Sequence, residues 1–316
     1  MLFPFQLLDE KEFDAVGFGL NALDHLVVVP EYPEFDTKIR LVEHVRAAGG
    51  QTASAMVALK RLGMKTAYAG RFGGDAEGIY GLETLRAESV NTGFAQTIEG
   101  ARNQIAFIII DERTGERTII WDRDERLAYK AEDAPVELAS RAPVLHMDAH
   151  DSLACARMAR AARDAGALVS VDVDNIYEGL PELLPLIDIL ISSKEFPNRL
   201  TGISDGRAAL QEIKVRYGCA IVGMTLGASG ATLLCDGVFL ESPAYVVPGC
   251  CRDTTGAGDA FHGGFLYGLL HGETVETSLK LANATAALKC RGLGARGSLP
   301  TLKELEEFMR SATPLI

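Results

Sequence analysis

Hydrophobic and polar positions follow two rhythms along this chain, and each rhythm predicts a different kind of element. After about residue 140, short apolar runs are separated by segments whose apolar residues recur at helical spacing. The runs predicted as strands are 144–149, 168–174, 188–193, 219–227 and 230–235, and those predicted as helices are 152–166 and 205–218. Because strands that alternate with helices pair in parallel, this half predicts a doubly wound α/β sheet.

The first part of the chain has a mixed pattern. A buried strand is predicted at 13–20, a helix at 51–64, a strand, glycine loop and helix at 65–90, strands at 24–30 and 37–50, and a hairpin at 104–122. Two strand groups do not fit the alternation, and we expect them to form a small separate sheet inserted as two pieces, about 23–47 and 101–123. The predicted architecture is a single domain over 1–316, a mostly parallel sheet flanked by helices with this small inserted β-sheet.

Composition and charge narrow the function classes. The 316 residues are 47% hydrophobic and 23% charged, which is typical of a globular protein. The formal net charge is −12 and no Lys/Arg cluster occurs, which argues against nucleic-acid and anionic-membrane partners. The chain has no apolar run long enough for a membrane span, no signal-peptide pattern at its start and no metal-ligand spacing among its six cysteines. We therefore expect a cytoplasmic protein with reduced thiols.

Two glycine patterns lack the context that a dinucleotide-binding fingerprint requires. "GFGLNA" at 17–22 precedes a strand where a helix is needed, and "GLGARG" at 292–297 follows a helical run. We interpret both as chance matches or as serving another purpose. The sequence contains no G-x-x-x-x-G-K-[ST], H-E-x-x-H or G-x-S-x-G pattern, and a P-loop NTPase is therefore excluded.

The stretch "DTTGAGDAFHGGF" at 253–265 carries the clearest chemistry. Backbone N–H groups at Gly256, Ala257 and Gly258 can converge on one point, and a helix beginning at about 257–259 would aim its positive dipole end there. Asp259 lies beside this anion cradle, where a carboxylate can take a proton from an attacking hydroxyl. A base next to a charge sink is what phosphoryl transfer needs.

An ordinary strand-to-helix turn, with Asp259 as a helix cap, is the alternative interpretation of this stretch. Gly263 and Gly264 each cost a helix about 1 kcal/mol relative to alanine, which indicates that something packs close to them. His262, between the base and these glycines, is interpreted as a structural histidine.

"DTTGAGDAF" resembles the C-terminal signature of the ribokinase-like (PfkB) carbohydrate kinases. The resemblance covers nearly the whole chain, since "GLNALDHLVVVPEYP", "AAGGQTASAMVALKRLG", "AGRFGGDAEG", "TLGASG" and "LANATAALKCRGLGARGSLP" follow in the family's order. "YPEFDTKIR", "ISSKEF" and "DAFHGGF" look most like the ketohexokinase and sugar-acid or sulfosugar kinase branch. The resemblance implies phosphorylation of a sugar by ATP and Mg²⁺, with Asp259 as catalytic base and Gly256–Gly258 as anion hole.

Residues on the sugar side also match the family. Asp24 matches the position that binds sugar hydroxyls, although a turn aspartate before a strand is the alternative. Gly49 and Gly50 match a glycine pair where the backbone approaches the substrate. Gln51 and Ser54 occupy positions of polar sugar contacts, but the family commonly has asparagine at the second. Because a hydroxyl reaches less far than an amide, Ser54 puts a ribose or plain fructose assignment in doubt.

The resemblance also implies nucleotide and cation sites. The positions that match the family's nucleotide side are Ser193, Thr225, Gly227, Gly230 and Asn283. The usual Asn-Glu-x-Glu motif is replaced at 193–196 by Ser-Lys-Glu-Phe, in which Glu195 is expected to organise Mg²⁺ through water. Asp253, Thr255 and Ser298 match a monovalent-cation site of some relatives, expected to hold K⁺. Capping of the glycine turn is the alternative for the first two.

The inserted strands correspond to a lid that covers the sugar and excludes water in the family. Such lids often pair with the lid of another subunit, so the resemblance implies a homodimer. The basic residues of this region are Lys38, Arg40, Arg102, Arg117 and Arg123. If two or three point inward, an anionic sugar is expected, and otherwise they are solvated lid charges.

Three functions remain open on the sequence. An ATP-dependent sugar kinase that phosphorylates a primary hydroxyl is the first, with a small sugar and ATP as its partners. A nucleoside kinase is the second, and it would need an apolar or aromatic wall in the lid. A catalytically idle sensor is the third. Loss of Asp259 or bulky residues at 256 and 258 would indicate a sensor, and the sequence has neither.

Overall fold

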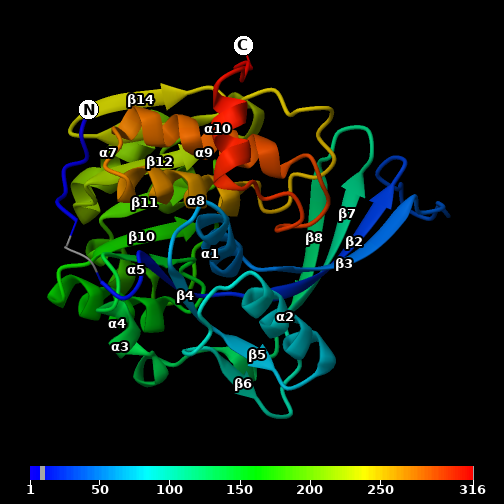
Figure 1. Ribbon diagram of the computed structural model, residues 1–316, viewed down its shortest axis with the longest axis horizontal. Helices are drawn as coiled ribbons and strands as arrows, with labels where there is room; N and C mark the ends of the chain where they lie inside the picture. Colours follow the sequence, from blue (N-terminus) through cyan, green and yellow to red (C-terminus); the bar gives the residue numbers. More distant parts are fainter. Residues whose placement is uncertain (8–10, 316) are drawn as a thin grey trace.

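An eight-stranded sheet forms the centre of the molecule, which we describe from a computed structural model covering residues 1–7 and 11–315 (Figure 1). In sheet order the strands are β14 (Val238–Ser242), β13 (Ala231–Cys235), β12 (Ile221–Thr225), β11 (Ile189–Ser192), β10 (Leu168–Val173), β9 (Val144–Met147), β1 (Ala15–Phe18) and β4 (Thr66–Ala69). From β4 to β12 every pair is parallel, as the strand-helix alternation predicts. These strands are buried almost throughout, because helices cover both faces of the sheet.

Strands β13 and β14 depart from the parallel pattern. β13 pairs antiparallel with both β12 and β14. Only Leu226–Gly230 separate β12 from β13, and a parallel crossover needs about a dozen residues. The parallel pairing that the alternation predicts is therefore wrong for the run 230–235, because its connection is too short.

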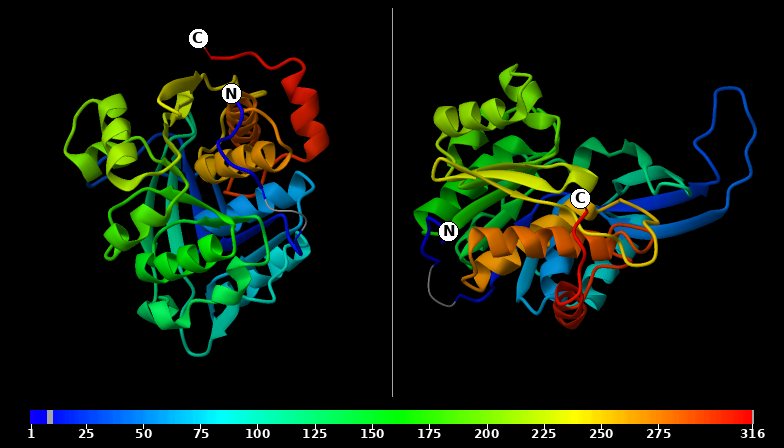
Figure 2. Two further views of the ribbon diagram at one scale, coloured as in Figure 1. Left: turned by 90° about the vertical axis from the view of Figure 1, so that its left-hand side faces the viewer. Right: turned by 90° about the horizontal axis from the view of Figure 1, so that it is seen from above.

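Two groups of helices bury the two faces of the sheet in separate hydrophobic clusters (Figures 1 and 2). One group is α1 (Gln51–Arg61), α2 (Ala76–Ala87), α8 (Ala257–Leu270), α9 (Val275–Lys289) and α10 (Leu302–Met309). The other is α3 (Val136–Ala139), α4 (Ser152–Asp164), α5 (Leu180–Leu183), α6 (Phe196–Thr201) and α7 (Gly206–Tyr217). The expected close packing of α8 is present, because a Cβ on Gly263 would lie 2.5 Å from that of Ala58 in α1.

A second sheet projects to one side of the main body and is called the lid below (Figure 2). Its order is β3 (Glu43–Gly49), β2 (Ala22–Val29), β7 (Ile105–Asp111) and β8 (Arg117–Asp122). The parallel pairing of β2 with β7 joins the two early strand groups, and β7 with β8 forms the predicted hairpin. The lid has its own small cluster of buried apolar side chains, centred on Leu26 and Ile108.

The strand predicted at 37–50 is partly wrong. Only 43–49 is β-strand, and 30–42 forms an extension that reaches furthest from the main sheet (Figure 2). Its side chains are almost all exposed. Alternation of apolar and polar residues builds a strand only where one face can be buried, and nothing in the described part of the chain forms a second layer over this segment.

The remaining elements connect the lid to the body. A two-stranded sheet of β5 (Arg71–Gly73) and β6 (Gln96–Ile98) lies beside α2.

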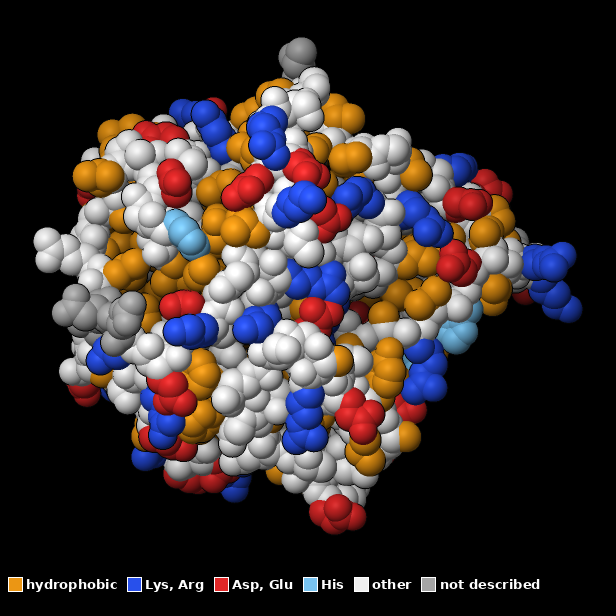
Figure 3. Space-filling model, in the orientation of Figure 1, with side chains coloured by type: hydrophobic (Ala, Val, Ile, Leu, Met, Phe, Trp, Pro, Cys, Tyr) orange, Lys and Arg blue, Asp and Glu red, His pale blue; other side chains and the backbone are white. Residues whose placement is uncertain are grey.

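Acidic and basic side chains are interspersed on the face shown in Figure 3, which carries no extended basic patch. Within 1–7 and 11–315, every helix is too short or too polar to span a bilayer.

Candidate active site

The glycine stretch opens helix α8 as predicted. Gly256 has a φ of 77°, in the left-handed region, and a Cβ there would lie 2.6 Å from the Cα of Ala295. The helix begins at Ala257, whose N–H donates to the carbonyl of Thr254 at 3.1 Å. A Cβ on Gly258 would meet no atom within 4 Å. The first turn of α8 therefore has an open side at Gly258, where an anion can approach the N–H groups of the turn, but the N–H of Ala257, predicted as one of the donors, is already bonded to Thr254.

Asp259 lies in this first turn and is only 8% exposed. Burial raises its pKa to about 8, and the neighbouring carboxylate of Asp172 adds to the rise. Arg117 and Arg296 act in the opposite direction, because a nearby positive charge favours the carboxylate. A carboxyl with a pKa near neutrality is suited to accept a proton from a hydroxyl.

A buried histidine pair lies beneath Asp259. His262 Nε2 lies 3.3 Å from Oδ1 of Asp172 at the end of β10, and its ring centroid is 5.1 Å from that of His146. Burial lowers the pKa of His146 to about 3, so this histidine is neutral. The contact between His262 and Asp172 fits the interpretation of His262 as a structural residue.

Asp24 faces the same region from strand β2 of the lid. Burial raises its pKa to about 7, Arg296 lowers it and Asp253 raises it. A Cβ on Gly49 would lie 2.1 Å from Oδ2 of Asp24, so only glycine at this position leaves room for the carboxyl. The predicted glycine pair therefore shapes the position of Asp24, because Gly49 makes room for it and Gly50, with a φ of 94°, is the N-cap of helix α1.

Arg296 was missed by the sequence analysis and joins both sides of the site. Its side chain is buried, with Nη2 donating to the carbonyl of Gly49 at 2.5 Å and Nε to Oγ of Ser54 at 3.3 Å. It affects the pKa of both Asp24 and Asp259. The small side chain at Ser54 thus leaves room for a guanidinium. The only sequence signal for Arg296 is its place in the "GLGARG" pattern, and that pattern does not indicate a buried arginine until the fold is known.

The other sugar-side prediction lies at the start of helix α1. Gln51 is the first residue of the helix and is half-buried, and Ser54 lies one turn later with no exposed surface. The two residues are therefore on one end of α1, next to the glycine pair. The hydroxyl of Ser54 already accepts a hydrogen bond from Arg296. Direct contact of Ser54 with a sugar remains a prediction.

The predicted nucleotide residues cluster at the ends of β11, β12 and β14. Thr225 Oγ1 lies 3.5 Å from the carbonyl of Ser192, beside Ser193. A Cβ on Gly230 would lie 2.0 Å from the carbonyl of Ser242, and Asn283 Nδ2 donates to the same carbonyl at 3.1 Å. Gly227 is the first residue of the short helical turn that joins β12 to β13. The fold therefore brings these positions together, and their contacts to a nucleotide remain predictions.

The metal-binding prediction rests on one exposed side chain. Glu195 is the N-cap residue of α6 and points into solvent. Within 1–7 and 11–315 no group of three His, Cys, Asp or Glu side chains is placed to hold a metal ion. A role of Glu195 in organising Mg²⁺ through water therefore remains a prediction.

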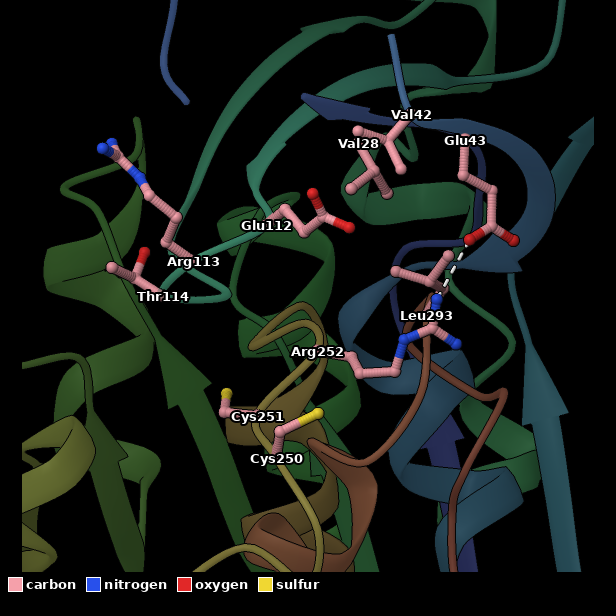
Figure 4. A pocket seen from close by; sticks show the side chains of 10 residues that line it. All are labelled: Val28, Val42, Glu43, Glu112, Arg113, Thr114, Cys250, Cys251, Arg252 and Leu293. Carbon is pink, nitrogen blue, oxygen red and sulfur yellow. Dashed lines mark hydrogen bonds and ion pairs between the residues drawn. The ribbon is translucent and has the colours of Figure 1, made fainter. Parts of the chain in front are cut away.

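The lid rests on the loop that precedes α8. Arg117 Nη1 donates to Oγ1 of Thr254 at 2.7 Å, and Thr254 N–H donates to the carbonyl of Gly115 at 3.2 Å. A cavity of about 270 Å³ lies beside this contact (Figure 4). It is lined by Val28, Val42, Glu43, Glu112, Arg113, Thr114, Cys250, Cys251, Arg252 and Leu293. Neither Asp24 nor Asp259 lines the cavity, so it flanks the site.

Lys38, Arg40 and Arg102 fit the solvated alternative, whereas Arg123 is mostly buried and Arg117 contacts the body. Arg102 pairs with Asp122 at 3.3 Å, with both side chains more than half exposed, and Lys38 and Arg40 are exposed. Arg123 is bound by both carboxylate oxygens of Asp151, at 2.8 Å each. Of the five basic residues, Arg117 alone contacts the loop before α8. An anionic sugar therefore gains no support from Arg102 or Arg123.

The first prediction concerns Gly49. Replacing Gly49 with alanine should displace the carboxyl of Asp24 and raise KM for the sugar by about 10- to 100-fold, while KM for ATP changes little. Steady-state kinetics with each substrate varied in turn measure both constants. Gly93→Ala on a surface loop is the control. Unchanged KM values for the sugar would show that Asp24 does not bind it.

The chain is similar to known proteins over nearly its whole length. The chain matches the pfkB family carbohydrate kinase profile over residues 18–302. It is 27% identical over 307 residues to a ribokinase of Haemophilus influenzae, covering 93% of this chain and 97% of that protein. It is 32% identical over 329 residues to fructokinase-1 of Oryza sativa, covering 94% and 98%. The structure of Arabidopsis thaliana ribokinase complexed with ribose and ATP matches with a TM-score of 0.79, 24% identity and coverage of 94% and 99%.

Proposed function

This chain belongs to the pfkB family of carbohydrate kinases, and we propose that it transfers the terminal phosphoryl group of ATP to a primary hydroxyl of a small sugar. The observation that carries the proposal is a buried carboxyl with a raised pKa, Asp259, in the first turn of a helix whose N-terminus is open at Gly258. This combination supplies a base and an anion hole at one point.

The chemistry assigned to these residues is an in-line displacement. Asp259 accepts the proton of the sugar hydroxyl, whose oxygen forms a bond to the γ-phosphorus as the bond to the β-phosphate oxygen breaks and ADP leaves. Asp24 forms hydrogen bonds with other hydroxyls of the sugar. The N–H groups at the start of α8 stabilise the transferred phosphoryl oxygens. Mg²⁺, when bound, would neutralise charge on the phosphates, with Glu195 holding one of its waters.

A panel of acceptors tests the function. We expect ADP release from MgATP with at least one neutral or anionic sugar, and no turnover without an acceptor. Turnover with nucleosides alone would favour a nucleoside kinase. No turnover with any acceptor, together with ATP binding by calorimetry, would favour a catalytically idle sensor.

The pH dependence of kcat/KM follows from Asp259. The free base is needed, and burial keeps this carboxyl protonated up to about pH 8. We therefore expect kcat/KM for the sugar to rise with pH and to reach half its plateau near pH 8, with about a tenfold loss per pH unit well below that value. Initial rates in a series of buffers of constant ionic strength measure the profile. A plateau that extends down to about pH 6 would contradict the assignment.

The lid also supports a proposal about assembly. Phe107 and its cross-strand partner Ile120 in β8 lie on one face of the lid, where they are 46% and 56% exposed, and His25 stacks on Phe107. Apolar side chains of this size seldom gather on the surface of a monomer. We therefore assign this surface to pairing with a second lid in a homodimer, which analytical ultracentrifugation can test.

A further inference from the structure

A buried lysine lies behind the anion loop. Lys289, the last residue of α9, and Asp253, at the start of the loop, each have a fully buried side chain. Lys289 Nζ donates to the carbonyl of Asp253 at 2.8 Å and lies 3.5 Å from the carbonyl of Gly292. The same nitrogen is 3.7 Å from Oδ2 of Asp253. Three oxygens from two chain segments therefore surround one ammonium group.

The carboxylate of Asp253 connects the same two segments. Its Oδ1 accepts the N–H of Thr255 at 2.8 Å, and its Oδ2 accepts the N–H of Gly294 at 2.7 Å. The loop that leads into α8 is thus fixed to the turn after α9 through Asp253 and Lys289. That loop positions the first turn of α8 and with it Asp259.

The predicted monovalent-cation site does not fit this arrangement. A K⁺ ion would need the carbonyl and carboxylate oxygens of Asp253, and Lys289 Nζ already contacts them. Ser298 Oγ is directed at Gly292, where a Cβ would lie 2.1 Å from it. Thr255 Oγ1 is buried without a hydrogen-bond partner in the described part of the chain, but one hydroxyl cannot replace the oxygens that surround the ammonium. Thr255 and Asp253 therefore fit the alternative, capping of the glycine turn.

We propose that the ammonium group of Lys289 takes the place of a bound monovalent cation and makes this kinase independent of K⁺. The proposal rests on the proposed function and assigns Lys289 as a positioning residue that acts through the loop 253–256. Nothing in the sequence pattern indicates this role, since a lysine in the last turn of a helix ordinarily interacts with the helix dipole in solvent. Burial lowers the pKa of Lys289, and the Asp253 carboxylate counteracts that effect.

The test compares four proteins: wild type, Lys289→Ala, Lys289→Met and the control Lys280→Met. Lys280 is an exposed lysine of the same helix. Initial rates and Tm are measured in KCl, NH4Cl and choline chloride at equal ionic strength. The alanine variant leaves space for a cation, whereas the methionine variant fills that space without charge.

We expect wild type and Lys280→Met to have the same rate and Tm in all three salts. Lys289→Ala should lose at least about tenfold in rate in choline chloride, because Asp253 is left without its cation, and its Tm should fall by about 5 °C or more. KCl or NH4Cl should restore a large part of both losses in this variant. Lys289→Met should lose rate and Tm without recovery.

Three results would overturn the proposal. The first is that the wild-type enzyme needs K⁺. The second is that Lys289→Ala is as active and as stable in choline chloride as wild type. The third is that KCl restores both Lys289 variants equally. The Tm values test the role of Lys289 even if no sugar is turned over. Failure of the proposed kinase activity is therefore distinguishable from failure of this proposal. If Lys289→Ala does not fold, the wild-type salt comparison and Lys289→Met decide it.

Discussion

Replacing Asp259 with asparagine is expected to reduce kcat by about 10³-fold or more while leaving the fold and ATP binding intact. A positioned general base contributes about 10²- to 10⁴-fold to a proton transfer, and asparagine of the same shape cannot accept the proton. The Asp259 side chain is buried at the start of α8, so a base from solvent cannot reach this position and take over the proton transfer. Initial-rate kinetics with the best sugar of the panel, and calorimetry with ATP, measure the two quantities.

The stability of this variant supplies an independent check. Asp259 has its pKa raised from 3.8 to about 8 in the folded protein, so the folded state holds this proton more tightly than the unfolded chain does. Ionisation of the carboxyl therefore costs folding free energy, and the cost grows as the pH rises from about 4 to about 8. Asp259→Asn should then have an equal or higher Tm than wild type at alkaline pH. A variant that keeps more than a tenth of the wild-type kcat would show that another group is the base.

The main sheet was predictable because its strands are buried on both faces and therefore appear as short apolar runs between helices. The antiparallel edge was not, because β13 differs from the parallel strands only in the length of the connection before it. The lid was predictable as an exception to the alternation, but the non-strand segment 30–42 was not. Whether an alternating segment becomes a strand depends on a second layer, which only the fold supplies.

The site divides in a similar way. Asp259 and its glycines could be predicted because residue type and spacing alone place a carboxylate beside free N–H groups. Asp172 and His262 could not be paired from the sequence, because they lie on elements far apart in the chain. Arg296 and Lys289 were missed for another reason: each lies in a stretch with an ordinary local explanation, and only burial shows that their charges are internal. The ketohexokinase or sulfosugar branch and a cytoplasmic location stay predictions.

Arg296 is the residue whose removal should most alter how the sugar is held. Its guanidinium donates to the carbonyl of Gly49 and the hydroxyl of Ser54 and lowers the pKa of Asp24 and Asp259. Methionine has a similar length but neither charge nor donors. Arg296→Met therefore leaves a carbonyl unpaired and two buried carboxyls without their shared cation, which is the costly way to break a buried charge cluster.

For Arg296→Met we expect kcat/KM for the sugar to fall by about 100-fold or more, mainly through KM, while KM for ATP changes little. Because Arg296 lowers the pKa of Asp259, its removal should raise that pKa and move the acidic limb of the kcat/KM profile to higher pH. Arg296→Lys keeps the charge but not the forked donors, so it should restore the pH profile while KM for the sugar stays high. The control is Arg291→Met, since Arg291 on the same segment pairs with Glu304 at 3.4 Å, away from both carboxyls. An Arg296→Met enzyme with unchanged KM and an unchanged profile would reduce Arg296 to a packing role, whereas a shifted profile with unchanged KM would confine it to tuning the base.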